Sequence, residues 1–224
     1  MSGNRYPCIT QRNDEPSLVA DVSSDLDVPS IVLGYDSIIP RWKTPTTLKW
    51  YLKDDTFRSE ERAERAAAAL NQAAEEWENI DFGVTVRQTE NAQEANFNLV
   101  YRKNPRNQPV ELGLGFFPHD ADRDMFIFTV ALLPERRDML KNVFLHELGH
   151  VFGLRHEFGL TETVPAKQFM TKNPMSVMEY NEVPTIQETD KEGIRAFYKL
   201  DEGFDLDGSP VTNFSPKLRS TNHT

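Results

Sequence analysis

The eleven residues from His146 to His156 constrain this chain more than any other stretch of its sequence. His146 and His150 are four residues apart, so on a helix they lie on one face, one turn apart, where they can share a metal ion. Gly153 tolerates positive φ and can end that helix, so the chain can turn and bring His156 to the same ion. Three nitrogen ligands suit Zn²⁺ and leave a fourth position for water, as in catalytic sites. The motif therefore predicts one catalytic zinc ion.

Glu147 follows the first histidine and is expected to point near the open coordination position. Zinc lowers the pKa of a bound water to about 7. A carboxylate beside that water can take its proton and deliver it to a leaving nitrogen, so we expect Glu147 to be the general base and acid. The competing interpretation is a chance helix with ordinary histidines, and the third histidine and the glycine in register weaken it. His119 and His223 have no partner at ligand spacing, and we expect both to be surface residues.

The composition fits one catalytic domain. The chain has 224 residues, of which 38% are hydrophobic and 10% aromatic, as in globular proteins. Its 25 basic and 35 acidic residues give a net charge of -10, which argues against a nucleic-acid partner. The sequence shows no secretory signal and no apolar run of about 20 residues that could span a membrane. The sequence leaves the localisation open: the protein works inside cells, leaves by another route, or has a leader that is missing from this chain. We expect it to be a monomer.

The spacing of apolar residues predicts an α+β domain. Apolar positions recur with helical spacing in residues 57–80, and two further helices are predicted, from residue 134 into the zinc motif and at 184–200. Strands are predicted where the pattern alternates, at 47–52, 82–86, 97–101, 112–117 and 125–132. These elements place one catalytic domain at residues 31–200, between a polar N-terminal segment (1–30) and a polar, mobile tail (201–224).

The motif resembles the signature of the metzincins, His-Glu-x-x-His-x-x-Gly-x-x-His followed by a methionine turn. Met178 lies 22 residues beyond His156 in Ser-Val-Met-Glu-Tyr and is our candidate for that methionine, with Met175 as a nearby competitor. The resemblance implies a single metzincin-like zincin domain, with a twisted, mostly parallel sheet, an antiparallel edge strand, two long helices and a C-terminal helix after the methionine turn. It also implies that Met178 forms an apolar floor beneath the three histidines.

Residues near the motif are similar to two metzincin subfamilies. Glu157 and the Ser-x-Met-x-Tyr turn resemble the astacins, in which the tyrosine can bind zinc and then stabilise the oxyanion. That role would fall to Tyr180, and a buried structural tyrosine is an equal alternative. The stretch Leu112–Phe117 and the residues just before the motif are more similar to the matrix metalloproteinases. The sequence therefore names no subfamily.

The resemblance also implies where substrate and a latency segment would bind. Metzincins hold the substrate as an added antiparallel strand along the edge strand, and the candidate here is Leu112, Gly113, Leu114, Gly115 and Phe116. An ordinary sheet edge is the alternative. Cys8, the only cysteine, could occupy the open zinc position as a cysteine switch does, although its flanking residues differ from the family pattern and a free thiol is the simpler interpretation. Asp36 is a weaker candidate for that role.

These observations predict a zinc-dependent endopeptidase that acts on proteins or peptides and is made as a zymogen. One alternative is a zincin-like binding module without catalysis, which the presence of Glu147 disfavours. Another is a zinc hydrolase acting on a non-peptide amide. No calcium site is predicted, because Asp120, Asp122 and Asp124 alternate without the glycine and glutamate of a calcium loop.

Overall fold

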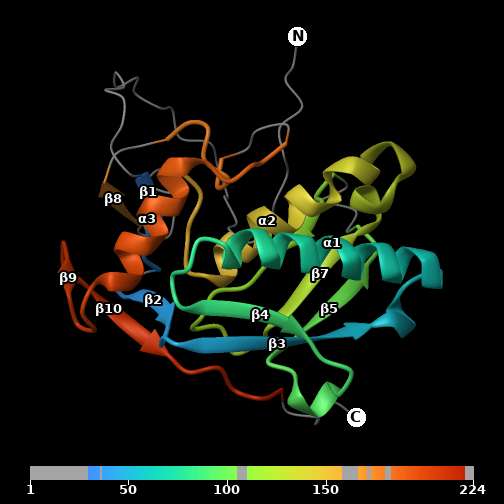
Figure 1. The fold of residues 1–224 in the computed structure, drawn as a ribbon, viewed down its shortest axis with the longest axis horizontal. Helices are drawn as coiled ribbons and strands as arrows, with labels where there is room; N and C mark the ends of the chain where they lie inside the picture. Colours follow the sequence, from blue (N-terminus) through green and yellow to red (C-terminus); the bar gives the residue numbers. More distant parts are fainter. Residues whose placement is uncertain are drawn as a thin grey trace.

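The computed structural model describes residues 30–35, 37–104, 110–157, 166–170, 173–179 and 183–219 (Figure 1). Its helices are α1 (Glu60–Glu78), α2 (Leu140–Val151) and α3 (Glu188–Lys199). Its strands are β1 (Ser30–Leu33), β2 (Ile39–Trp42), β3 (Thr46–Lys53), β4 (Val84–Gln88), β5 (Phe97–Arg102), β6 (Gly113–Leu114), β7 (Asp124–Phe128), β8 (Lys167–Met170), β9 (Asp205–Leu206) and β10 (Ser209–Phe214). Within these residues, no helix is long and apolar enough to cross a membrane.

The central sheet has five strands in the order β4-β3-β5-β7-β6. The first four strands are parallel, and β6 pairs antiparallel with β7 at the edge of the sheet. Strands buried in a parallel sheet carry apolar side chains, and Leu48, Trp50 and Leu99 are fully buried here. The predicted fold class, an α+β domain with a mostly parallel sheet and an antiparallel edge strand, is confirmed.

The predicted long helix forms α1, which begins at Ser59, where the hydroxyl accepts a hydrogen bond from the Arg62 amide. Its buried side is rich in alanine, so α1 can lie close to the sheet and to α2. Trp77 of α1 donates its indole N–H to the carbonyl of Leu145 on α2 at 2.9 Å. That hydrogen bond fixes α2, which carries the zinc motif, against α1 beside the sheet (Figure 1).

The described residues after α3, which end at residue 219, belong to the folded domain, contrary to the predicted mobile tail. β10 pairs parallel with β2, with Val211 opposite Ile39, and β9 pairs with β10. Arg41 of β2 is buried and donates to the carbonyls of Phe197 at 2.7 Å and Leu200 at 2.6 Å. Residues 205–214 therefore complete a second small sheet, which Arg41 joins to the end of α3, and this sheet was not predicted.

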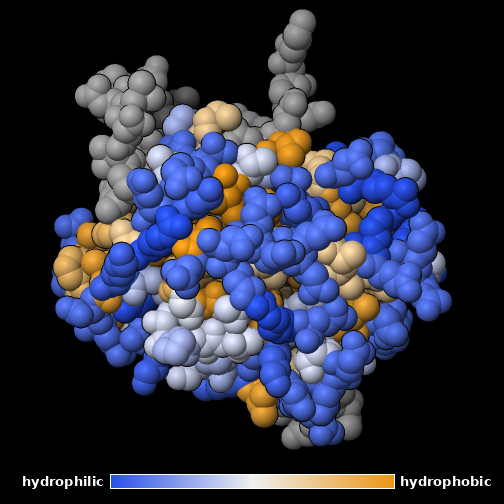
Figure 2. All heavy atoms as spheres, viewed as in Figure 1, coloured by the Kyte–Doolittle hydropathy of each residue, from blue (hydrophilic) through white to orange (hydrophobic). Residues whose placement is uncertain are grey.

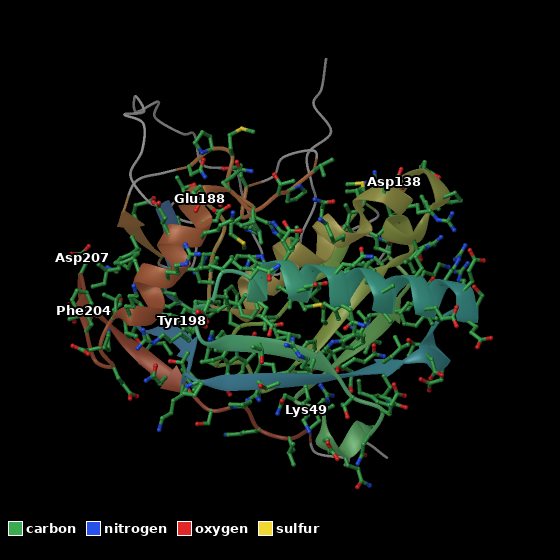
Figure 3. The ribbon with its side chains drawn as sticks, in the orientation of Figure 1. Lys49, Asp138, Glu188, Tyr198, Phe204 and Asp207 are labelled. Atoms are coloured by element: carbon green, nitrogen blue, oxygen red, sulfur yellow. The ribbon has the colours of Figure 1, made fainter. Side chains whose placement is uncertain are left out.

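Tyr198 connects this small sheet to the end of α2. Figure 3 places Tyr198 on α3, and its buried hydroxyl donates to the carbonyl of Phe152 at 3.1 Å. Burial raises the pKa of Tyr198, so the phenol stays protonated and keeps this donor. Trp42 of β2 donates its indole N–H to the carbonyl of Val151 at 2.7 Å. These two bonds satisfy carbonyls at the C-terminus of α2, which the helix itself leaves unpaired.

β1 and β8 form a separate antiparallel pair that lies next to the zinc motif. The backbone N–H of Arg155 donates to the carbonyl of Val32 on β1 at 2.8 Å. The residue before the third histidine is therefore hydrogen-bonded to β1.

Hydrophilic side chains cover most of the face shown in Figure 2, and the hydrophobic patches on it are small.

Candidate metal centre

The first two candidate ligands lie on α2 in the interior of the protein. His146, Glu147 and His150 are fully buried. The apolar residues of α2 surround them, and a helix that is apolar on nearly all sides occupies the centre of a core. As the spacing predicts, His146 and His150 lie one turn apart with ring centroids 5.0 Å apart. The rigid core around α2 thus fixes both imidazoles.

Gly153 ends the helix as predicted, with a φ of 93°. The amide of Leu154 donates to the carbonyl of Gly149 and the amide of Gly153 to that of His150, each at 2.9 Å, which is the Schellman pattern of helix ends. A Cβ atom on Gly153 would lie 2.4 Å from the carbonyl oxygen of Pro40, so the position requires glycine for space as well as for φ. The turn then returns the chain towards α2.

His156 meets the other two histidines through its Nε2 atom. That atom lies 3.1 Å from Nε2 of His146 and 3.2 Å from Nε2 of His150. Nitrogen ligands about 2.0–2.1 Å from a tetrahedral zinc ion stand roughly 3.3 Å from one another. Both distances therefore match the spacing of ligands in a zinc site. Among the described residues, the three histidines are the one group of three or more His, Cys, Asp or Glu side chains that could hold a metal ion.

The tautomers of two histidines favour metal binding. Nδ1 of His146 lies 2.8 Å from the carbonyl oxygen of Val177, and Nδ1 of His150 lies 2.9 Å from that of Leu154. A carbonyl oxygen can only accept, so each Nδ1 carries the proton and each Nε2 keeps its lone pair. The outer hydrogen bonds thus aim both lone pairs at the cluster.

The buried histidines are neutral at neutral pH. Burial lowers the pKa of His146 to about 4. Burial also holds the pKa values of His150 and His156 well below the ordinary value, and repulsion from the neighbouring imidazoles lowers them further. Neutral imidazole is the form that binds a metal ion, so these histidines do not have to release protons when an ion binds.

The Glu147 carboxylate lies against the edge strand. Its Oε2 atom accepts a hydrogen bond from the backbone N–H of Gly115 at 2.7 Å. The predicted edge strand, Leu112 to Phe117, forms only the short β6, and Leu112 and Phe116 are buried beside it. The structure thus brings the candidate base and the candidate substrate edge together.

Met178 is buried against the zinc helix, whereas Met175 is 60% exposed. A Cβ atom on Gly149 would lie 2.2 Å from the sulfur of Met178, so the methionine packs directly on the turn of α2 between His146 and His150. The geometry therefore favours Met178 over Met175 as the residue beneath the histidines. Its role as a floor for a bound ion stays a prediction.

Asp190 is a residue of the site that the sequence did not reveal. It lies in the first turn of α3, and its buried carboxylate accepts from the hydroxyl of Ser176 at 2.6 Å and from the amides of Val177 at 3.0 Å and Gln187 at 2.8 Å. Because the carbonyl of Val177 orients His146, Asp190 anchors the turn that holds the first ligand. The available signal was the capping box that Gln187 and Asp190 form at the start of the helix.

His119 is not an ordinary surface residue. Its side chain is 20% exposed, and its ring packs on Tyr35 with centroids 4.6 Å apart and on Phe117 at 6.0 Å. Phe117 in turn packs edge-on against His150 with centroids 5.4 Å apart. Burial lowers the pKa of His119, so it is a neutral part of the aromatic wall behind the second ligand. His223 lies outside the described residues.

The alternating acidic residues Asp120, Asp122 and Asp124 have partners within the protein. Arg219 lies 3.3 Å from a carboxylate oxygen of Asp122 and 2.7 Å from one of Asp124. A third acid, Asp120, accepts from the amide of Phe117 at 2.7 Å. The guanidinium thus supplies the positive charge that two of these carboxylates face.

Three predicted site residues, Cys8, Asp36 and Tyr180, lie outside the described residues. Glu157, which follows the third ligand, is described and buried. Its backbone N–H donates to the carbonyl of Met178 at 3.3 Å, and its carboxylate accepts from the amide of Asn173 at 3.1 Å. Glu157 thus ties the loop of the third ligand to the methionine turn.

One comparison with known proteins, a match to a family model, agrees with the geometry. Residues 135–202, which include the whole motif, Met178 and α3, match the model of a protein family described as Met-zincin. A comparison with curated protein sequences finds no significant match. Among solved structures, metalloproteinase-II from Bacteroides fragilis matches with a TM-score of 0.38 and 12% identity, over 76% of this chain and 57% of that chain. The chain thus spans little more than half the length of that structure.

The family match and the histidine cluster together confirm the predicted resemblance to the metzincins over this segment. They support a zinc metallopeptidase-like site built from His146, His150 and His156.

Proposed function

We propose that this protein is a zinc-dependent endopeptidase that hydrolyses peptide bonds in proteins or peptides. The observation that carries the proposal is the convergence of three neutral imidazole Nε2 atoms, two of them oriented by backbone carbonyls, with the Glu147 carboxylate on the same helix. Three nitrogen ligands leave one position open, which is the arrangement of a catalytic rather than a structural zinc site.

Bound zinc would polarise the substrate carbonyl and lower the pKa of a water molecule to about 7. Glu147 would accept the proton of the attacking water and would deliver it to the nitrogen of the leaving amine. Burial of Glu147 excludes bulk water, which strengthens the electrostatic interactions of its carboxylate with the reacting groups. From the resemblance, Tyr180 would stabilise the oxyanion.

The substrate would bind as an extended strand along β6. This strand forms the edge of the sheet, and it lies beside Glu147. Backbone hydrogen bonds to an edge strand supply affinity for any extended peptide, and side-chain pockets supply preference. Such binding suits an endopeptidase better than a hydrolase of small amides, because the latter does not need a strand to pair with.

The zincin-like binding module and the hydrolase of a non-peptide amide are the competing functions. A binding module does not need a buried carboxylate beside the open metal position, and burying an unneeded carboxylate is costly. The amide hydrolase keeps the same residues and differs only in substrate, so only an assay separates it from a peptidase.

The test compares casein and gelatin cleavage by the wild-type protein, Glu147→Ala and the exposed control Glu64→Gln on α1, with zinc content measured for each. We expect stoichiometric zinc in all three proteins and cleavage by the wild type and the control. Loss of Glu147 should lower kcat by at least about a hundredfold, because it removes the general base. Stoichiometric zinc without cleavage, even after removal of residues 1–29, would reject the proposal.

A further inference from the structure

The edge strand touches the candidate base through two glycines. A Cβ atom on Gly113 would lie 2.8 Å from Oε1 of Glu147 and 2.9 Å from its Cγ. A Cβ atom on Gly115 would lie 2.8 Å from the Glu147 carbonyl oxygen and 3.2 Å from Oε2. Real Cβ atoms essentially never approach heavy atoms within 3.0 Å, so any larger residue at either position would displace Glu147 or the strand.

The backbone of the same strand binds the carboxylate. The carbonyl of Leu112 accepts from the amide of Phe128 on β7 at 3.0 Å, so the polar groups of Leu112 face into the sheet. In an antiparallel pair, alternate residues direct their backbone groups to opposite edges of the strand. The backbone N–H and C=O groups of Gly113 and Gly115 therefore point away from β7. The Gly115 N–H donates a hydrogen bond to Oε2 of Glu147 at 2.7 Å.

We propose that Gly113 and Gly115 are positioning residues for the general base: the missing side chains let the Glu147 carboxylate reach the strand, and the Gly115 N–H fixes one of its oxygens. The proposal rests on the proposed peptidase function for its catalytic meaning. It assigns to the alternating glycines of Leu-Gly-Leu-Gly a task separate from pairing with substrate.

The arrangement has a chemical advantage for a peptidase. A glutamate side chain has three rotatable bonds, and ordering it during the reaction would cost conformational entropy. The Gly115 N–H, directly after β6, orients the carboxylate before substrate binds, and the pairing of β6 with β7 holds this backbone in place. If the substrate pairs with β6, then the scissile bond and the base are both placed by the same short strand, which preserves near-attack geometry.

The steric contact is tested by a double-mutant cycle on thermal stability, which does not require activity. Gly113→Ala should lower the melting temperature by on the order of 5 °C in the wild-type background, because the added methyl group overpacks against Glu147. In the Glu147→Ala background, most of that loss should disappear, since the space is vacated. The control is Gly83→Ala, where a Cβ atom would lie 3.0 Å from Thr44 instead. Gly83→Ala should lower the melting temperature by the same amount in both backgrounds. If Gly113→Ala also lowers it equally in the wild-type and Glu147→Ala backgrounds, the proposal is overturned.

The hydrogen bond is tested by amide exchange at Gly115. Exchange should be at least about tenfold faster in Glu147→Ala than in the wild type, because the acceptor is gone. Glu147→Gln keeps an amide oxygen as acceptor and should restore most of the protection. An unchanged exchange rate in Glu147→Ala would reject the assigned role of the Gly115 N–H.

The catalytic role is read from the split between kcat and KM for a fluorogenic peptide. Gly113→Ala should lower kcat by about tenfold or more while KM changes by less than roughly threefold, with zinc content unchanged. A rise in KM with an unchanged kcat would show that the glycines serve substrate pairing, and it would overturn the positioning role. If the wild type cleaves no peptide while the stability cycle and exchange behave as expected, then the peptidase function fails and the glycine contacts with Glu147 stand.

Discussion

Asp190 should contribute more stability at acidic pH than at neutral pH, whereas a hydrogen-bonded carboxylate usually contributes more at neutral pH. Burial raises its pKa from an ordinary 3.8 to about 6, even though three hydrogen bonds from Ser176, Val177 and Gln187 favour the charged form. The perturbation that exposes this effect is Asp190→Asn, which keeps the shape of the side chain and removes its titration.

The magnitude follows from linkage. The folded state binds the Asp190 proton more tightly than the unfolded state, so the group contributes stability below its unfolded pKa and loses it as pH rises through the folded value. A shift of about 2 pH units corresponds to about 3 kcal/mol of unfolding free energy. The unfolding free energy of the wild type minus that of Asp190→Asn should therefore fall by about 2 kcal/mol between about pH 4 and pH 7.5, because part of the change lies below pH 4.

The assay is urea unfolding of the zinc-free proteins, followed by the fluorescence of the buried Trp42, Trp50 and Trp77. Titration of the histidines occurs in both proteins and cancels in the difference. Glu64→Gln, on the exposed face of α1, is the control. A difference that stays constant within about 1 kcal/mol over this pH range, or that grows with pH, would refute the reasoning.

Three further predictions concern packing and latency. Gly149→Ala forces a methyl group into the sulfur of Met178, so urea unfolding should show a loss of about 1–3 kcal/mol, and an unchanged midpoint would contradict the packing. Deleting residues 205–224 removes β9 and β10 and uncovers β2, so the melting temperature should fall by on the order of 10 °C, whereas a dispensable tail would leave it unchanged. Cys8→Ala should raise basal cleavage if its thiolate blocks the metal, and equal activity would dismiss the switch.

The features that local sequence determines were predicted well. α1 follows from apolar spacing within its own residues, and the end of α2 follows from Gly153, whose turn depends on backbone conformation. The convergence of His146, His150 and His156 also follows, because a helix and one turn separate them. Distant packing has little influence on such short-range geometry.

The features that depend on distant pairing were missed. β2 is four residues long and contains Pro40, and its parallel partner β10 lies in a segment that composition marks as a mobile tail. Asp190 binds a turn whose amide at Val177 is 13 residues away, and the local capping box with Gln187 does not identify that distant partner. The burial of His119 likewise depends on Tyr35 and Phe117, which only the fold brings together.

The pairing of β10 with β2 also sets the order in which the protein can be completed. Arg41 and Asn213 are hydrogen-bonded across 172 residues of sequence, so the emerging chain must carry β2 without its neighbour until those intervening residues have been made. Unpaired strand edges on a growing chain attract other chains, and non-local contacts form slowly. For most of that interval the C-terminus of α2 also lacks Tyr198, so the helix that carries the zinc motif acquires this support only after α3 has been made.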